Sequence, residues 1–197
     1  MNQTVIGITG GTGCGKTTAL NALSALGFHI IDCDALYHQL LQTDRPMLDD
    51  IEHAFPGVLL DGQLQRKVLG QRVFSDPAAL DLLNRTVWPH VCRAVEEQIK
   101  ANAPRPCAID AIGLLESGLG DLCTYTVAIT APEEARVARL MAREHISEEY
   151  ARLRIRAQKS NEEFENACHL TLENNCADAE AFQKKCSESF IKLLSSN

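Results

Sequence analysis

A glycine-rich segment near the beginning of the chain constrains the fold more than any other feature. Residues 10–17 read GGTGCGKT, which matches the pattern G-x-x-x-x-G-K-[ST] in full. The apolar run Val5–Thr9 precedes this segment, and apolar residues recur at helical spacing from 19 to 26 behind it. A strand, a glycine loop and a helix in this order predict a phosphate-binding loop on a buried parallel strand. The alternative, a glycine-rich turn with an incidental lysine, does not explain these flanks.

The residues of this loop have separate tasks in binding phosphate groups. Glycines let backbone N–H groups turn inward around a phosphate, and the following helix adds the positive end of its dipole. Lys16 is expected near the β- and γ-phosphates, and Thr17 is expected to offer its hydroxyl to Mg²⁺. The dipole and Lys16 are also expected to lower the pKa of the Cys14 thiol. The expected phosphate-binding set is Gly11, Thr12, Gly13, Cys14, Gly15, Lys16, Thr17 and Thr18.

The composition is that of a soluble globular protein. The 197 residues suffice for one sizeable domain with a subsidiary lobe, and 45% hydrophobic and 23% charged content is ordinary. No apolar stretch approaches the roughly 18 residues of a membrane span, and the start lacks the basic region of a signal peptide. A net charge of −7 disfavours nucleic-acid binding. The eight cysteines form no C-x-x-C pair, so we expect reduced thiols, no zinc site and a cytoplasmic location.

Short apolar runs alternate with helical patterns along the rest of the chain. Beyond the first strand, further strands are expected in four runs: 28–32, 107–110, 125–130 and 170–172. This alternation predicts an α/β fold with a parallel, doubly wound sheet of about five strands. Residues 35–103 contain no strong strand signal and are predicted to be mostly helical. Ser147 is expected to cap another helix, which runs to Gln158.

Acidic residues follow two of the predicted strands, at the end where open α/β sheets bind ligands. Asp34 is a candidate for accepting a proton from an attacking hydroxyl group or for ordering the water around Mg²⁺. The alternative is that Asp34 only caps a helix beginning at Ala35. Asp32 is evenly balanced between these roles. Asp110 stands where an acid near the metal is expected, and the alternative is that it only caps a helix or lies in a surface turn. Glu116 is a candidate for contacting the acceptor or a loop arginine.

Basic residues gather between positions 136 and 159. Arg136, Arg139 and Arg143 are spaced three and four apart and share one face of a predicted helix. Such a face is usually solvated, but phosphoryl transfer needs cations that close over the transferring group. We therefore expect Arg139 or Arg143 to belong to a lid. Trp88, the only tryptophan, is expected to pack in the core, with stacking on a ligand's base as the alternative.

Several segments also match, in order and spacing, the motifs of one family. Residues 9–17 fit its loop T-G-G-x-G-S-G-K-[ST] with Cys14 in place of serine, and 32–34 stand where it has D-A-D. The remaining matches are 73–77 to V-F-x-D-P, 139–143 to R-x-x-x-R, 146–158 to L-S-x-E-x-A-x-x-R-I-x-x-Q, and the late Asn174. Through these motifs the chain resembles the dephospho-CoA kinase family over nearly its whole length. It departs from the family where His38, Gln65 and Trp88 replace Arg, Asp and His, and where 110–116 lack a proline.

The resemblance implies a P-loop kinase fold made of three parts. A nucleotide-binding core is expected from residues 1–34, 104–135 and 168–197. A helical acceptor-binding lobe is expected from 35–103 and a helical lid from 136–167. The implied reaction moves the γ-phosphoryl group of ATP, with Mg²⁺, to the 3′-hydroxyl of dephospho-CoA. Alternatives are another small-metabolite or nucleotide kinase, a GTPase switch, or an ATP-binding protein without catalysis.

The resemblance also implies roles for particular residues. Catalysis would rest on Asp34, Lys16 and Arg143, and Thr17 would bind the metal. Besides the loop, ATP would be bound by Arg139, Arg143 and Asn174. The acceptor would be bound by Asp32, Asp34, Arg66, Asp110 and Glu116. We expect a monomer or weak homo-oligomer that binds neither nucleic acid nor membranes.

Overall fold

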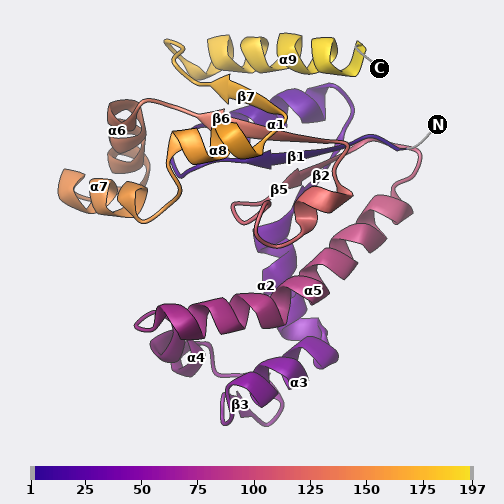
Figure 1. Ribbon diagram of the computed structural model, residues 1–197, viewed down its shortest axis with the longest axis vertical. Helices are drawn as coiled ribbons and strands as arrows, with labels where there is room; N and C mark the ends of the chain where they lie inside the picture. Colours follow the sequence, from indigo (N-terminus) through magenta and orange to yellow (C-terminus); the bar gives the residue numbers. More distant parts are fainter. Residues whose placement is uncertain (1–2, 196–197) are drawn as a thin grey trace.

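A five-stranded parallel sheet forms the centre of the molecule (Figure 1). The structure is a computed structural model that describes residues 3–195. All neighbouring strands are parallel. Their order from edge to edge is β2 (His29–Asp32), β5 (Cys107–Asp110), β1 (Val5–Thr9), β6 (Tyr125–Thr130) and β7 (Leu170–Glu173). The predicted α/β fold and its parallel sheet are confirmed, and each strand begins within one residue of its predicted start.

Both faces of the sheet are buried, because successive residues of a strand point to opposite sides. On one side, Ile6 and Ile8 pack with apolar residues of α1 (Lys16–Ala25) and α9 (Ala179–Ser195). On the other side, Val5 belongs to a core that continues into the helices between β2 and β5. A strand that is buried on both faces needs no polar alternation, which is why the strands appear in the sequence as continuous apolar runs.

The segment between β2 and β5 is almost entirely helical and extends away from the sheet, into the lower half of Figure 1. Its helices are α2 (Cys33–Thr43), α3 (Arg45–Ala54), α4 (Arg66–Val73) and α5 (Pro77–Ala101). Their apolar faces share one hydrophobic core with one side of the sheet. Even α5, with 25 residues, is not apolar enough to span a membrane, and no helix within residues 3–195 is both long and apolar enough.

A small hairpin interrupts this helical segment and differs from the prediction, which placed no strong strand there. Strand β3 (Leu59–Leu60) pairs antiparallel with β4 (Gln63–Leu64). The turn residues Asp61 and Gly62 have φ angles of 50° and 74°, and a type I′ hairpin turn requires positive φ at both positions. The sequence gives no strand signal here, because two-residue strands are too short to show an alternating pattern.

Three helices stand between β6 and β7: α6 (Glu133–Glu144), α7 (Glu148–Arg156) and α8 (Asn161–Ala167). The predicted cap at Ser147 is present, since its hydroxyl accepts a hydrogen bond from the Tyr150 amide at 3.2 Å. Apolar residues of α6 and α7 form a small core of their own. Arg152 of α7 also bonds to the carboxylates of Glu133 and Glu134 at the start of α6. These contacts join α6 and α7 into one unit beside the glycine loop.

Candidate active site

The glycine loop, residues 10–15, joins β1 to α1 at the carboxyl end of the sheet's central strand. Two of its positions require glycine. Gly10 has φ 137°, and a Cβ there would lie 2.1 Å from the Ile129 carbonyl oxygen. Gly15 caps α1 with φ 104°, and a Cβ there would lie 2.5 Å from the amide nitrogen of Asn174. The loop is therefore closely surrounded by the sheet and by neighbouring side chains.

Side chains from distant parts of the chain bind the loop's carbonyl groups. Arg136 donates from Nε to the Thr12 oxygen at 2.9 Å, and Arg139 donates to the Gly13 oxygen at 3.0 Å. Asn174 donates from Nδ2 to the Cys14 oxygen at 2.9 Å. With these carbonyls fixed, the first amides of α1 lie at a helix N-terminus, where backbone N–H groups have no partner within the helix. Such a terminus favours an anion.

Arg136 and Gln158 are positioning residues that sequence reasoning did not identify. Arg136 is only 4% exposed, and its guanidinium lies between the loop and Gln158. The Gln158 Oε1 atom accepts hydrogen bonds from the Thr12 amide at 2.8 Å and from Arg136 at 3.2 Å. The Thr12 amide, expected to bind phosphate, therefore already has a protein partner. The three-and-four spacing of the arginines indicated a shared face but not which arginine was buried.

Lys16 and Asp110 face a cavity of about 330 Å³ next to the loop. The Lys16 Nζ atom donates to the Gly10 oxygen at 2.7 Å. Burial lowers the pKa of Lys16, and the carboxylate of Asp110 is the strongest influence in the opposite direction. Burial also raises the pKa of Asp110, and Lys16 partly opposes that shift. The two side chains therefore form a mutually dependent pair of opposite charges beside the loop.

Arginines from the two helices after β6 line the same cavity. Arg139, Arg143 and Arg154 lie on it together with Thr17. The Arg143 side chain is 61% exposed and donates to Glu144 at 2.5 Å. Arg154 also pairs with Glu144. Arg139 contacts the loop, whereas Arg143 lies on the cavity and forms its ion pair with Glu144.

The two aspartates after β2 differ in their surroundings. Asp32, not Asp34, is the N-cap of α2: its Oδ1 atom accepts a hydrogen bond from the Ala35 amide at 2.9 Å. The alternative of Asp34 as a cap is therefore wrong. Asp34 lies in the first turn of α2 with an exposed side chain, and its negative charge is close enough to raise the pKa of Lys16.

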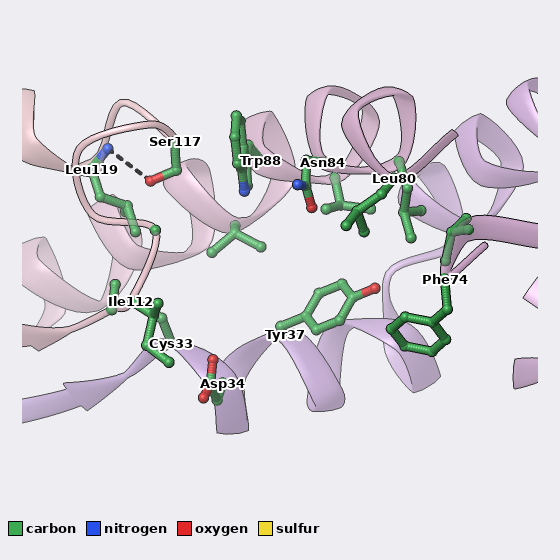
Figure 2. A pocket seen from close by; sticks show the side chains of 16 residues that line it. Cys33, Asp34, Tyr37, Phe74, Leu80, Asn84, Trp88, Ile112, Ser117 and Leu119 are labelled. Atoms are coloured by element: carbon green, nitrogen blue, oxygen red, sulfur yellow. Dashed lines mark hydrogen bonds between the residues drawn. The ribbon is translucent and has the colours of Figure 1, made fainter. Parts of the chain in front are cut away.

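A second cavity, of about 320 Å³, lies between α2, α5 and the loop after β5 (Figure 2). Asp34 lines it near one end, and Phe74, whose side chain is largely exposed, lines it at the other. Ile112 lines both this cavity and the cavity around Lys16, so the two cavities are neighbours. Half-buried Trp88 packs against the hydrophobic core, as expected, and also forms part of the cavity wall. The lining is otherwise mostly apolar: Cys33, Tyr37, Val73, Leu80, Leu83, Asn84, Val87, Val91, Ala111, Gly113, Ser117 and Leu119.

The remaining predicted site residues lie at the margins. Glu116 forms an ion pair with Lys159 at 2.6 Å, which joins the loop after β5 to the segment after α7. Arg66 lines neither of these two cavities. It lies on a shallow hollow with Lys67 and Phe74, and Phe74 connects this hollow to the second cavity.

The expectation for Cys14 is wrong. The residue is 0% exposed, and burial raises the pKa of its thiol above the ordinary value. Arg136 and Lys16 act in the opposite direction but do not outweigh burial. Cys14 therefore packs as a small apolar side chain under the loop.

The fold and site define a class: a phosphate loop at the end of the central parallel strand, faced by basic helices, is the arrangement of P-loop kinases. The family described as dephospho-CoA kinase matches residues 4–180. A dephospho-CoA kinase of Dehalococcoides mccartyi is 34% identical over 87% of this chain and 89% of its own length. A dephospho-CoA kinase of Moorella thermoacetica is 38% identical over 78% of this chain and 76% of its own length. The chain belongs to the dephospho-CoA kinase family and is thus an ATP-dependent kinase.

Solved structures agree on the fold. A crystal structure of a Thermus thermophilus protein has a TM-score of 0.81 at 30% identity and covers 98% of this chain and 99% of its own. A dephospho-CoA kinase from Campylobacter jejuni has a TM-score of 0.69 at 24% identity, covering 98% of both chains. A shikimate kinase from Acinetobacter baumannii, at 15% identity and a TM-score of 0.59, covers 96% of this chain and 94% of its own and shares the fold alone.

Proposed function

We propose that this kinase transfers the γ-phosphoryl group of ATP to the 3′-hydroxyl of dephospho-CoA, with ATP in the loop cavity and the acceptor on the side of Asp34. The observation that carries this proposal is the contact of the two cavities at Ile112, with Lys16 on one side and Asp34 on the other. A phosphoryl donor and an alcohol acceptor need two adjoining sites of this kind. The exposed Asp34 carboxylate has no capping role that would occupy it.

In this mechanism the loop amides and Lys16 bind the phosphates of ATP. Asp34 accepts the proton of the 3′-hydroxyl as its oxygen forms a bond to the γ-phosphorus, and the bond from that phosphorus to the β,γ-bridging oxygen breaks. The electron pair of the broken bond stays on ADP, and Asp34 later releases the proton to water. Arg139 and Arg143 stabilise the negative charge on the transferring group. Asn174 acts indirectly, because it positions the loop carbonyl of Cys14.

The donor groups near the loop fit a magnesium ion. Thr17 offers a hydroxyl in the first turn of α1, and Asp110 offers a carboxylate on the same cavity. Oxygen ligands of these types, together with substrate phosphates, are what Mg²⁺ prefers. When bound, the ion would neutralise charge on the β- and γ-phosphates. Its positive charge would also lower the pKa of Asp110, which burial raises.

Three further expectations belong to this proposal. The acceptor contacts of Asp32, Arg66 and Glu116 are part of it, with the last two at the edge of the acceptor side. A reducing, cytoplasmic location is supported by the eight free cysteines. A monomer or weak homo-oligomer is the assembly that we propose.

An acceptor screen tests the proposal. ADP release would be measured with dephospho-CoA, adenosine, AMP and shikimate in parallel, and without acceptor. We expect dephospho-CoA to give the highest kcat/KM and the reaction without acceptor to be slow. Lys16→Ala, which removes a cation from the transition state, serves as the inactive control. A higher kcat/KM for AMP or shikimate would show that the acceptor assignment is wrong, and binding of ATP without turnover on any acceptor would show that the protein is not an active kinase.

A further inference from the structure

The second cavity contains one side-chain amide that the protein itself does not use. Asn84 lies on α5 between apolar residues such as Leu83 and Val87, and it lines the cavity. Within the described residues 3–195, its amide has no hydrogen-bond partner in the protein. Figure 2 shows the amide on the α5 side, directed into the space between α5 and α2. A carboxamide offers a donor and an acceptor side by side, so it can form two hydrogen bonds with a complementary edge.

Aromatic rings lie on opposite walls of the same cavity. Trp88 projects from α5, one turn after Asn84, and Tyr37 projects from α2 across the space (Figure 2). Both are half-buried. Tyr37 makes a tilted contact with the His38 ring, with centroids 5.9 Å apart, and Trp88 makes no ring contact within the described residues. Two opposed aromatic walls favour a flat ligand, since aromatic rings prefer stacked or edge-on contacts with other rings. The cavity volume of about 320 Å³ is at the lower end of the range of about 300–1,000 Å³ for ligand pockets, which suits one ring system.

The position of Asp34 relates this cavity to the reaction. Asp34 lines the cavity, so a group bound there lies within reach of the proposed base. In dephospho-CoA the reacting 3′-hydroxyl belongs to the ribose that carries the adenine. We propose that the cavity binds the adenine ring of the acceptor, and that Asn84 determines specificity by bonding to the N6 and N7 atoms of that ring. This inference rests on the proposed function and specifies where the acceptor's base lies.

The chemistry of the adenine edge matches the amide. The N6 amino group donates and N7 accepts, and an asparagine side chain can satisfy both in one plane. Hypoxanthine, which has an oxygen in place of the N6 amino group, presents two acceptors and would leave the Asn84 oxygen facing another oxygen. Trp88 and Tyr37 contribute stacking that does not distinguish these bases. Selectivity between the two bases is thus assigned to Asn84 and overall affinity to the aromatic walls.

Binding can be measured without catalysis, because Trp88 is the only tryptophan in the chain. Dephospho-CoA and its hypoxanthine analogue would each be titrated without ATP while tryptophan fluorescence is recorded. We expect saturable quenching by dephospho-CoA, and weaker binding of the analogue by roughly tenfold or more, the scale of one good bidentate contact. In Asn84→Leu the affinity for dephospho-CoA should fall by roughly tenfold to a hundredfold, and the difference between the two bases should disappear. Saturable quenching that is equal for the two bases in the wild type would overturn the role of Asn84, and no quenching by either would overturn the cavity assignment.

Kinetics and stability complete the test. In Asn84→Leu, kcat/KM for dephospho-CoA should fall while KM for ATP changes by less than about twofold. The melting temperature should not fall, because the Asn84 amide makes no bond within the protein. A lower melting temperature with unchanged base selectivity would show a purely structural role. Arg85→Leu, on the solvent side of the same helix, is the matched control and should leave selectivity intact. If the wild type quenches with base selectivity but does not phosphorylate dephospho-CoA, the proposed function fails while the base site stands.

Discussion

Neighbouring residues of the same type have different roles in this site. Asp32 and Asp34 are two residues apart, yet Asp32 bonds to the backbone at the start of α2 and the Asp34 carboxylate remains exposed. The sequence predicts that both lie at the end of a strand, and it does not decide which one caps the helix and which one takes part in the reaction. That choice depends on which residue begins the helix, and helix starts are uncertain by one or two residues even in structures. A two-residue difference decides here between the aspartate that caps α2 and the aspartate proposed as the base.

Paired substitutions separate these roles. Asp34→Asn removes the proposed base but keeps the size of the side chain, and kcat should fall by roughly a hundredfold with the melting temperature unchanged. Asp32→Ala removes a helix cap worth about 1 kcal/mol, which should lower the melting temperature by about 2–4 °C and reduce kcat much less. Thermal unfolding and steady-state kinetics would be measured on the same samples. A large loss of stability in Asp34→Asn would contradict this division.

Arg143 tests whether planar geometry or charge alone matters in the proposed lid. Its exposed side chain gains little from the ion pair with Glu144, so folding should be unaffected by Arg143→Lys. Lysine keeps the charge but loses the paired donors of the guanidinium. We expect kcat/KM for ATP to fall by roughly tenfold to a hundredfold. Arg139→Lys is the companion variant, and full activity in both would mean that these arginines are merely solvated.

At the scale of elements, α6 and α7 are fastened to the phosphate loop through Arg136 and Gln158. Gln158 follows the end of α7 and bonds to both Arg136 and the Thr12 amide. The fit is close, since a Cβ at Gly11 would lie 2.2 Å from the Arg136 guanidinium. If α6 and α7 move towards bound ATP, either these hydrogen bonds shift with them or the helices bend on the far side of the bonds. The geometry of the loop and the position of α6 and α7, the proposed lid, are thereby coupled.

Gln158→Leu should release this coupling. Removing the shared acceptor leaves the Thr12 amide without a partner and takes one hydrogen bond from the buried Arg136, which keeps its bond to the Thr12 oxygen. We therefore expect KM for ATP to rise by roughly tenfold, with a smaller change in kcat. Gln158→Glu keeps an oxygen acceptor and should retain most of the affinity for ATP. Amide hydrogen exchange provides the second readout, since the Thr12 amide should exchange faster in Gln158→Leu. Equal effects of the leucine and glutamate variants would argue against the hydrogen bonds as the cause.

The elements were predicted to different degrees. The long apolar runs of β1, β5 and β6 were visible because both faces of the sheet are buried. The β3–β4 hairpin depends on two positive φ angles in Asp61 and Gly62, and α8 depends on a capping box at Ser160 with few apolar residues behind it. Burial of Arg136 and the free amide of Asn84 result from packing between segments far apart in the chain. No spacing rule within one helix can reveal them.

At the scale of the whole molecule, the buried charge of Asp110 lowers the free energy of unfolding. The pKa of Asp110 is raised in the folded protein, mainly by burial. Between the ordinary pKa near 4 and the raised value, the folded state binds more protons than the unfolded state. Unfolding free energy therefore decreases as the pH rises through this window, and the penalty is fully present above it. The ionised Asp110 is kept in spite of this penalty.

Asp110→Asn should remove that penalty. At pH 7 the variant should melt at a higher temperature than the wild type. The difference should shrink as the pH falls from the raised pKa of Asp110 towards about 4, and it should vanish below that pH, where Asp110 is uncharged in both the folded and the unfolded state. Thermal unfolding at several pH values would measure this, and circular dichroism would confirm an unchanged fold. Activity should fall in the same variant, because the proposed metal site loses its carboxylate. A lower melting temperature at pH 7 would mean that the attraction between Asp110 and Lys16 outweighs burial.

Buried and half-buried cysteines have a consequence for an enzyme whose substrate and product both carry a thiol. Burial raises the pKa of seven thiols, those of Cys14, Cys33, Cys92, Cys107, Cys123, Cys168 and Cys186, and for Cys33 in the second cavity the value reaches about 12. Exchange with a disulfide requires the thiolate form. A disulfide form of the substrate or product that reaches any of these seven sulfurs would therefore meet a protonated, unreactive thiol. These seven thiols therefore resist the formation of mixed disulfides with the enzyme's substrate or product.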